Sequence, residues 1–141
     1  MSYLLWAILA LVAYTLVAPL MSIATNGQAS IPSNVATLLG NGILVAITMG
    51  VVTYTGENPT QYLTHPKAGF VYTAGACLGI GILAYYKALS QGPVSVVSPI
   101  FAMFLVTSSI VGILVLDEPA SARKLAGIAL AGVSVYLVST G

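Results

Sequence analysis

Five long apolar segments dominate the sequence, and they restrict the chain to one kind of environment. A helix needs about 20 mostly apolar residues to cross the roughly 30 Å hydrocarbon core of a bilayer, because each residue adds about 1.5 Å. Segments of that length cover residues 3–23, 35–54, 68–89, 94–116 and 120–140. We therefore expect an all-α integral membrane protein with five transmembrane helices in one membrane domain, residues 1–141.

Charged residues are too few to cover a water-facing surface. Only 5% of the residues are charged and 58% are hydrophobic, whereas soluble domains carry about 25% charged residues. The net charge of +1 gives no electrostatic basis for binding nucleic acid. A single cysteine, Cys77, excludes an intrachain disulfide and a cysteine-based metal cluster. The lipid bilayer is therefore the expected solvent for most of the chain.

The residue pattern offers no basis for catalysis. His65 has no histidine or cysteine partners at metal-ligand spacing, so we expect no metal site. The sequence contains no phosphate-binding glycine loop and no recognisable Ser–His–Asp arrangement. We expect neither an enzymatic activity nor a cofactor.

An odd number of spans puts the two termini on opposite faces of the membrane. The face of the N-terminus also receives the loops at residues 55–67 and 117–122, and with them Lys67, Arg123 and Lys124. The other face has only Lys87. Under the positive-inside rule this difference favours a cytoplasmic N-terminus in the cell membrane, plasma or inner. One or two further charges would reverse the preference.

Residues 84–141 resemble the C-terminal part of an EamA domain. The features that carry the resemblance follow one another in order: Tyr86-Lys87-Ala88-Leu89 at the end of a span, a tight turn with Pro93, Ser98-Pro99 in the next span, and Asp117-Glu118 before the last. The N-terminal part matches less specifically, through LLWAILALVAYTLVAPL. The resemblance covers most of the chain and is carried by its C-terminal part.

EamA domains make up the drug/metabolite transporter superfamily, whose typical members join two five-span repeats of opposite orientation. This chain resembles one such repeat standing alone. Inverted repeats build alternating-access sites near the bilayer midplane, and a single copy holds half of such a site. The resemblance therefore implies a transporter for a small polar or amphipathic metabolite. It would act as a homodimer, antiparallel or parallel, or together with a related half-transporter chain.

Polar and aromatic groups within the expected spans are the candidates for a substrate path: Tyr14, Asn41, Tyr86, Lys87 and Ser98. Lys87 lies about two residues, or roughly 3 Å, inside the end of its span. Its stem either carries the charge to the interface or presents it to the path, where it would attract an anionic group. A basic residue here recurs in the family that the sequence resembles. Asn41 either forms a hydrogen bond to a neighbouring helix or contacts the substrate. Tyr86 either anchors the helix at the membrane interface or contacts the substrate.

Two prolines and two pairs of small residues are expected to shape the helices. Pro19 and Pro99 lack a backbone N–H, so each would kink its span or serve as a hinge. Small residues separated by three others let a second helix approach closely. Such pairs are Gly75 with Gly79 and Gly127 with Ala131.

Carboxylates occur only outside the interiors of the expected spans. Asp117 and Glu118 precede the last span, and we expect them to cap its positive dipole end. Pairing with Arg123 or Lys124 would be weak where solvent reaches it. The absence of a carboxylate within any span argues against proton–cation exchange through a membrane-embedded acid. Coupling through Lys87 and uncoupled movement both stay open.

Three other functions stay open beside the homodimeric transporter. The first is an obligate subunit of a heteromeric transporter, which the charge difference between the two faces favours. The second is a non-transporting membrane protein that regulates another complex. A passive pore has less support, because the sequence shows neither a ring of charges nor a filter loop.

The charge distribution predicts how the chain labels in intact cells. With Cys77 replaced, a single cysteine in loop 25–33 should react with a membrane-impermeant thiol reagent, and one in loop 55–67 should not. Labelling of both loops would instead show that the chain inserts in two orientations, as an antiparallel homodimer requires. Labelling of loop 55–67 alone would contradict the predicted orientation.

Overall fold

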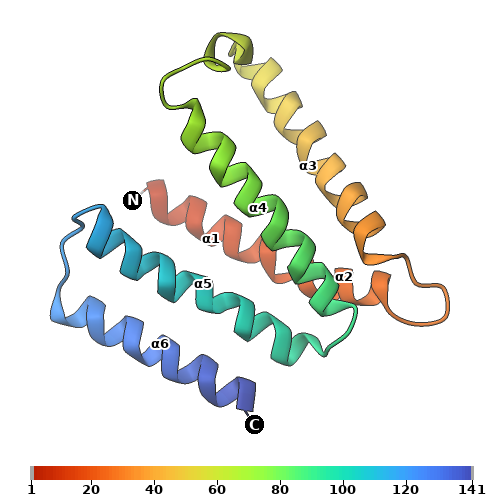
Figure 1. Cartoon of the computed structure of the whole chain (residues 1–141), viewed down its shortest axis with the longest axis vertical. Helices are drawn as coiled ribbons and strands as arrows, with labels where there is room; N and C mark the ends of the chain where they lie inside the picture. Colours follow the sequence, from red (N-terminus) through yellow and green to blue (C-terminus); the bar gives the residue numbers. More distant parts are fainter. Residues whose placement is uncertain (1, 141) are drawn as a thin grey trace. The chain divides into compact units, whose positions relative to one another are not determined.

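A computed structural model describes residues 2–140, which are helical apart from short connections (Figure 1). The elements are α1 (Ser2–Thr15), α2 (Val17–Thr25), α3 (Ser33–Thr55), the 3-10 helix η1 (Pro59–Tyr62), α4 (Ala68–Leu89), α5 (Val94–Val115) and α6 (Ala122–Thr140). The described residues contain no strand. The expected all-α fold is confirmed.

In the described part of the chain, five helical segments are long and apolar enough to cross a membrane. They are Tyr3–Thr25, Ser33–Thr55, Ala68–Leu89, Val94–Val115 and Ala122–Thr140. The shortest, with 19 residues, extends about 29 Å at about 1.5 Å per residue, close to the thickness of the hydrocarbon core. The expected number of spanning helices is confirmed.

The chain divides into two compact units, residues 1–18 with 91–141 and residues 19–90. In the first unit, α5 and α6 run antiparallel as neighbours, joined by a short connection (Figure 1). In the second unit, α3 and α4 form a helical hairpin whose longer connection contains η1 (Figure 1). Asn58 begins η1, and its Oδ1 accepts hydrogen bonds from the Thr60 N–H at 3.2 Å and hydroxyl at 2.7 Å.

The two prolines within spans have different surroundings. Helix α1 ends at Thr15 and α2 begins at Val17, so the helix is interrupted one turn before Pro19. The missing N–H of Pro19 leaves the Thr15 carbonyl without its helical partner. Pro99, by contrast, lies within α5, which continues from Val94 to Val115. A hinge at either proline stays a prediction.

One stripe of α3 is covered, and it lies in the N-terminal half of the helix. Ser33, Ala36 and Thr37 are buried, and Gly40 and Asn41 are half-buried one turn further on. This spacing is that of one helical face. A methyl group at Gly40 would lie 3.0 Å from the Met21 Cε, so α2 packs closely against this face. An added methyl group would require the flexible end of the Met21 side chain to shift.

Asn26 joins the end of α2 to the end of α4 within the second unit. Its Nδ2 donates to the Leu89 carbonyl oxygen at 3.0 Å and to the Ser22 carbonyl oxygen at 2.7 Å. The carbonyls in the last turn of a helix have no partner within it, and Leu89 is the last residue of α4. Leu89 is also fully buried. Asn26 therefore pairs a carbonyl that would otherwise be buried without a donor.

This contact predicts an unequal effect of two asparagine-to-aspartate changes. Asn26→Asp replaces the donating amide by a carboxylate facing two carbonyl oxygens, and should lower the free energy of unfolding by about 1–3 kcal/mol. Asn58→Asp keeps the oxygen that accepts from Thr60. It should change the free energy of unfolding by less than about 0.5 kcal/mol. Denaturant unfolding in detergent micelles, followed by circular dichroism, measures both. Equal effects would show that the Asn26 contact does not stabilise the fold.

Candidate substrate path and the α5–α6 junction

The residues expected along a substrate path are divided between the two units. Tyr14 and Ser98 belong to the first unit, and Asn41, Tyr86 and Lys87 to the second. Tyr14, on α1, is 67% exposed, and Ser98, on α5, is half-buried. Each unit thus holds some of these residues, and their part in a substrate path stays a prediction.

The end of α4 presents a charge beside two buried rings. Tyr85 and Tyr86 are buried, with ring centroids 5.8 Å apart. Lys87, in the last turn, is exposed. Its carbonyl accepts a 2.7 Å hydrogen bond from the Ser90 hydroxyl, which closes the helix end. A cation in the last turn is also favoured by the helix dipole. The backbone is therefore fixed while the ammonium group stays accessible.

Asn41 differs from the threonines of α3. Thr37 and Thr48 donate to the carbonyls of Ser33 and Leu44 at 2.7 and 2.8 Å, so their hydroxyls are satisfied by their own helix. The half-buried Asn41 amide makes no side-chain hydrogen bond to any residue in 2–140. It lies about 12 Å along α3 from Ser33. Two N–H donors and one carbonyl acceptor are therefore available at that depth.

The two pairs of small residues differ in their surroundings. A methyl group added at Gly75 or Gly79 would meet no atom within 4 Å, so this face of α4 is open. Close packing through these two glycines stays a prediction. Gly127 and Ala131 instead line an open groove of about 260 Å³ between α5 and α6. Their small size leaves space between the two helices in place of a tight contact.

The connection between α5 and α6 is organised around Gly112. The Gly112 carbonyl accepts from the backbone N–H groups of Leu116 and Glu118, both at 3.2 Å. Asp117 has a φ of 52°, in the left-handed region that Asp tolerates better than most residues. This turn lays the Glu118 side chain over Gly112, where an added Cβ would lie 3.3 Å from the Glu118 Cδ.

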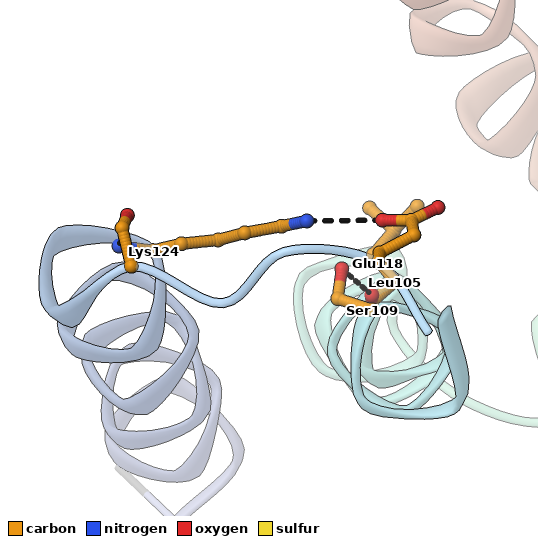
Figure 2. A network of polar contacts seen from close by, with 5 residues as sticks. Leu105, Ser109, Glu118 and Lys124 are labelled. Atoms are coloured by element: carbon orange, nitrogen blue, oxygen red, sulfur yellow. Dashed lines mark hydrogen bonds and ion pairs between the residues drawn. The ribbon is translucent and has the colours of Figure 1, made fainter. Parts of the chain in front are cut away.

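Lys124 extends from α6 across the junction to Glu118 (Figure 2). Its Oε2 lies 2.9 Å from the Lys124 Nζ, and the two side chains are 49% and 40% exposed. An ion pair this accessible is worth at most about 1 kcal/mol. Its main effect is to hold the Glu118 carboxylate beside Lys124, which lines the α5–α6 groove.

The expectation that Asp117 and Glu118 cap the last helix is wrong. Helix α6 begins at Ala122, and the Ser121 hydroxyl oxygen accepts from the Lys124 N–H at 3.2 Å, which is the geometry of an N-cap. Asp117 instead lies in the turn that ends α5. The carboxylates are too early in the chain to cap α6, because three residues separate Glu118 from Ala122.

Several residues that organise these contacts have only weak signals in the sequence. Asn26-Gly27 is a turn signal, which predicts where a helix ends but not the contact with α4. Ser121 has the residue type of an N-cap and lies just before the helix. Gly112 has no sequence signal that separates it from the other glycines. Among residues 2–140, no group of three or more His, Cys, Asp or Glu side chains is arranged to hold a metal ion.

Together these features define a multi-pass helical membrane protein with polar groups at its helix ends. The chain matches the EamA-like transporter family over residues 1–140. It is also 27% identical over 138 residues to a protein of Sinorhizobium sp. named "Uncharacterized transporter in cobO 3'region", an alignment that covers 95% of this chain and 96% of that protein. No solved structure matches. The chain belongs to the EamA-like transporter family, as the resemblance of residues 84–141 implies, and it is a membrane transporter of that family.

The junction predicts opposite effects of adding a side chain at two glycines. Gly132→Ala, in α6, meets no atom within 4 Å and should raise the free energy of unfolding by up to about 1 kcal/mol through helix propensity. Gly112→Leu would displace the Glu118 side chain from its position over α5. This change should lower the free energy of unfolding by about 1–3 kcal/mol. Thermal unfolding in detergent measures both. An unchanged stability in Gly112→Leu would show that Glu118 moves aside without cost.

Proposed function

We propose that two copies of this chain assemble around a shared path and move a small polar or amphipathic metabolite across the cell membrane. The observation that carries the proposal is the exposure of the helices. No more than 11% of the apolar window of any spanning segment is buried. One chain alone leaves most of its helical surface to lipid or to another chain.

The polar groups on that surface favour a second chain over lipid alone. An amide or an ammonium group facing hydrocarbon is costly unless it finds a partner or water. Asn41, about 12 Å from the start of α3, makes no side-chain hydrogen bond within the described chain. A path between two chains supplies what it lacks, either a substrate group or the polar side chains of the other copy.

The relative from Sinorhizobium sp. supports a working unit of this size. The alignment covers 96% of that protein, which is named a transporter. A chain of about this length therefore carries the transporter name without a fused second repeat. We propose that residues 1–141 form a single EamA domain and that a second copy takes the place of the second repeat. Labelling of loops 25–33 and 55–67 decides whether the two copies are parallel or antiparallel.

Each of the path residues has a proposed role. Lys87 attracts a carboxylate or other anionic group of the substrate at one end of the path, and Tyr86 offers a ring beside it. Asn41 provides hydrogen bonds deeper in the membrane. Tyr14 and Ser98 add polar groups from the first unit.

The same proposal assigns roles to the backbone features. The open face at Gly75 and Gly79 allows a helix of the second copy to approach α4 closely. Pro19 and Pro99 are the points at which the helices would bend as the path opens on one side and then on the other. The charge difference between the two faces favours a cytoplasmic N-terminus, with the C-terminus on the opposite face; in an antiparallel pair the second copy has the reverse orientation.

A heteromeric transporter is the second candidate. Lys67, Arg123 and Lys124 belong to one face by the span count and Lys87 to the other. A fixed orientation follows from that difference if it is strong enough, and a chain with one orientation needs an oppositely inserted partner to complete an inverted pair. Transport by the purified chain alone in liposomes would exclude this arrangement.

The path predicts a specific requirement for the lysine at the end of α4. Purified chain in liposomes should take up members of a mixture of amino acids, organic acids and nucleobases, read by mass spectrometry. Lys87→Ala should lower uptake of the anionic members by about tenfold, because a hydrogen bond to a charged group is lost. Lys67→Ala is the matched control, since Lys67 is also exposed but lies at the other end of α4.

Unchanged uptake by Lys87→Ala would remove Lys87 from the path and leave it as an interface anchor. Absence of uptake by the unaltered chain, with restored uptake after a second chain from the same cells is added, would favour the heteromer. Absence of uptake under both conditions would contradict the transporter path proposed here.

A further inference from the structure

The groove between α5 and α6 is open and lined mostly by apolar residues. Its lining residues are Leu105, Val106 and Ser109 from α5 and Lys124, Gly127, Ile128 and Ala131 from α6. The Ser109 hydroxyl donates to the Leu105 carbonyl of its own helix at 2.8 Å (Figure 2), so little of its polarity is directed into the groove. From Lys124 to Ala131 the groove follows α6 for about 10 Å, roughly a third of the hydrocarbon core.

Among the described residues, Lys124 is the one charged residue that lines the groove, and Glu118 lies beside it. Lys124 and Arg123 lie in the first turn of α6, whose dipole is positive at that end. Asp117 and Glu118 follow the last turn of α5, whose dipole is negative there. Each pair has the same sign as its own helix end. The arrangement is therefore unfavourable for the helices themselves, and it places two positive residues close in the chain to two negative ones at this junction.

The four side chains retain most of their capacity to bind a ligand. The ion pair uses one N–H of Lys124 and one oxygen of Glu118, and an ammonium group has three N–H donors while a carboxylate has about four acceptor positions. Within residues 2–140, Arg123 and Asp117 form no ion pair and no side-chain hydrogen bond. A ligand can join this network without removing the Glu118–Lys124 contact.

We propose that the groove binds a phospholipid whose headgroup carries a primary ammonium, a phosphatidylethanolamine. Its phosphate lies on Lys124 and Arg123, its ammonium donates to Glu118 and Asp117, and the upper part of one acyl chain occupies the groove. The charges select this headgroup. A purely anionic lipid would place its phosphate beside two carboxylates without a cation to pair with them. A choline headgroup has the cation but no N–H to donate to a carboxylate.

Lipid retained by the purified full-length chain tests the site. The protein is equilibrated with vesicles of equal phosphatidylethanolamine, phosphatidylglycerol and phosphatidylcholine with identical acyl chains, and bound lipid is read by native mass spectrometry. The ethanolamine lipid should be retained in clear excess over the other two. Lys124→Gln and Glu118→Gln should each lower that excess by up to about fivefold, the range for accessible ion pairs. Lys67→Gln, which removes an exposed cation outside the groove, should leave it unchanged.

A second pair of variants tests the groove itself. Gly127→Leu fills the space between α5 and α6 and should lower retention of all three lipids. Gly132→Leu, on α6 but not among the residues lining the groove, should leave retention unchanged. Thermal unfolding reports whether each variant is folded, and the charge variants decide the question if Gly127→Leu is not.

Three results would overturn the proposal. Equal retention of the ethanolamine and choline lipids would remove the role of the carboxylates. Preference for phosphatidylglycerol would show an anion site in which the carboxylates take no part. Undiminished binding of the ethanolamine lipid by both Gly127→Leu and Lys124→Gln would place the lipid elsewhere on the chain. None of these results depends on transport, so the test is independent of the proposed function.

Discussion

The need to pair every backbone N–H and C=O within lipid underlies the rest of the structure. Only closed hydrogen-bonding patterns survive without water, and this chain meets the requirement with helices and with hydroxyls that bond back to their own helix, such as Thr48 to Leu44 at 2.8 Å. The requirement fails at helix ends, where four carbonyls or N–H groups have no helical partner. Two such ends are satisfied by Asn26, which donates to the Leu89 carbonyl, and by the turn whose N–H groups donate to the Gly112 carbonyl.

The contrast between helix ends and helix flanks connects the fold to its use. Within each unit the ends are joined by hydrogen bonds or an ion pair, whereas the flanks of the spanning segments are mostly exposed. Exposed apolar flanks can contact either lipid or other helices. The hydrophobic effect does not favour one over the other in a bilayer, where helices associate through close packing and polar contacts. In the second unit, lipid cannot offer a hydrogen bond to the Asn41 amide, and the open glycine face of α4 favours close contact with another helix.

Two lysines that look alike in sequence have different surroundings in the structure. Lys87 and Lys124 both lie in a terminal turn of a spanning helix. Lys124 is held 2.9 Å from Glu118, which localises its charge at the α5–α6 groove. Lys87 has no acidic partner among residues 2–140 and is exposed beside two buried tyrosines. The first charge belongs to a network of four, and the second is available to a mobile ligand.

The sequence by itself determined the fold class, the number of spanning helices and the family, because the length of an apolar run and the order of residues 84–141 are local properties of the chain. It also placed candidate path residues on particular helices, and those roles stay proposals. Only the tertiary structure showed that Ser121 caps α6, that Asn26 holds the end of α4, and that Glu118 lies over Gly112. Each of these contacts depends on the path of a turn. If a turn were one residue longer or shorter, a different side chain would make the contact. Residue type alone does not predict the length of the turn.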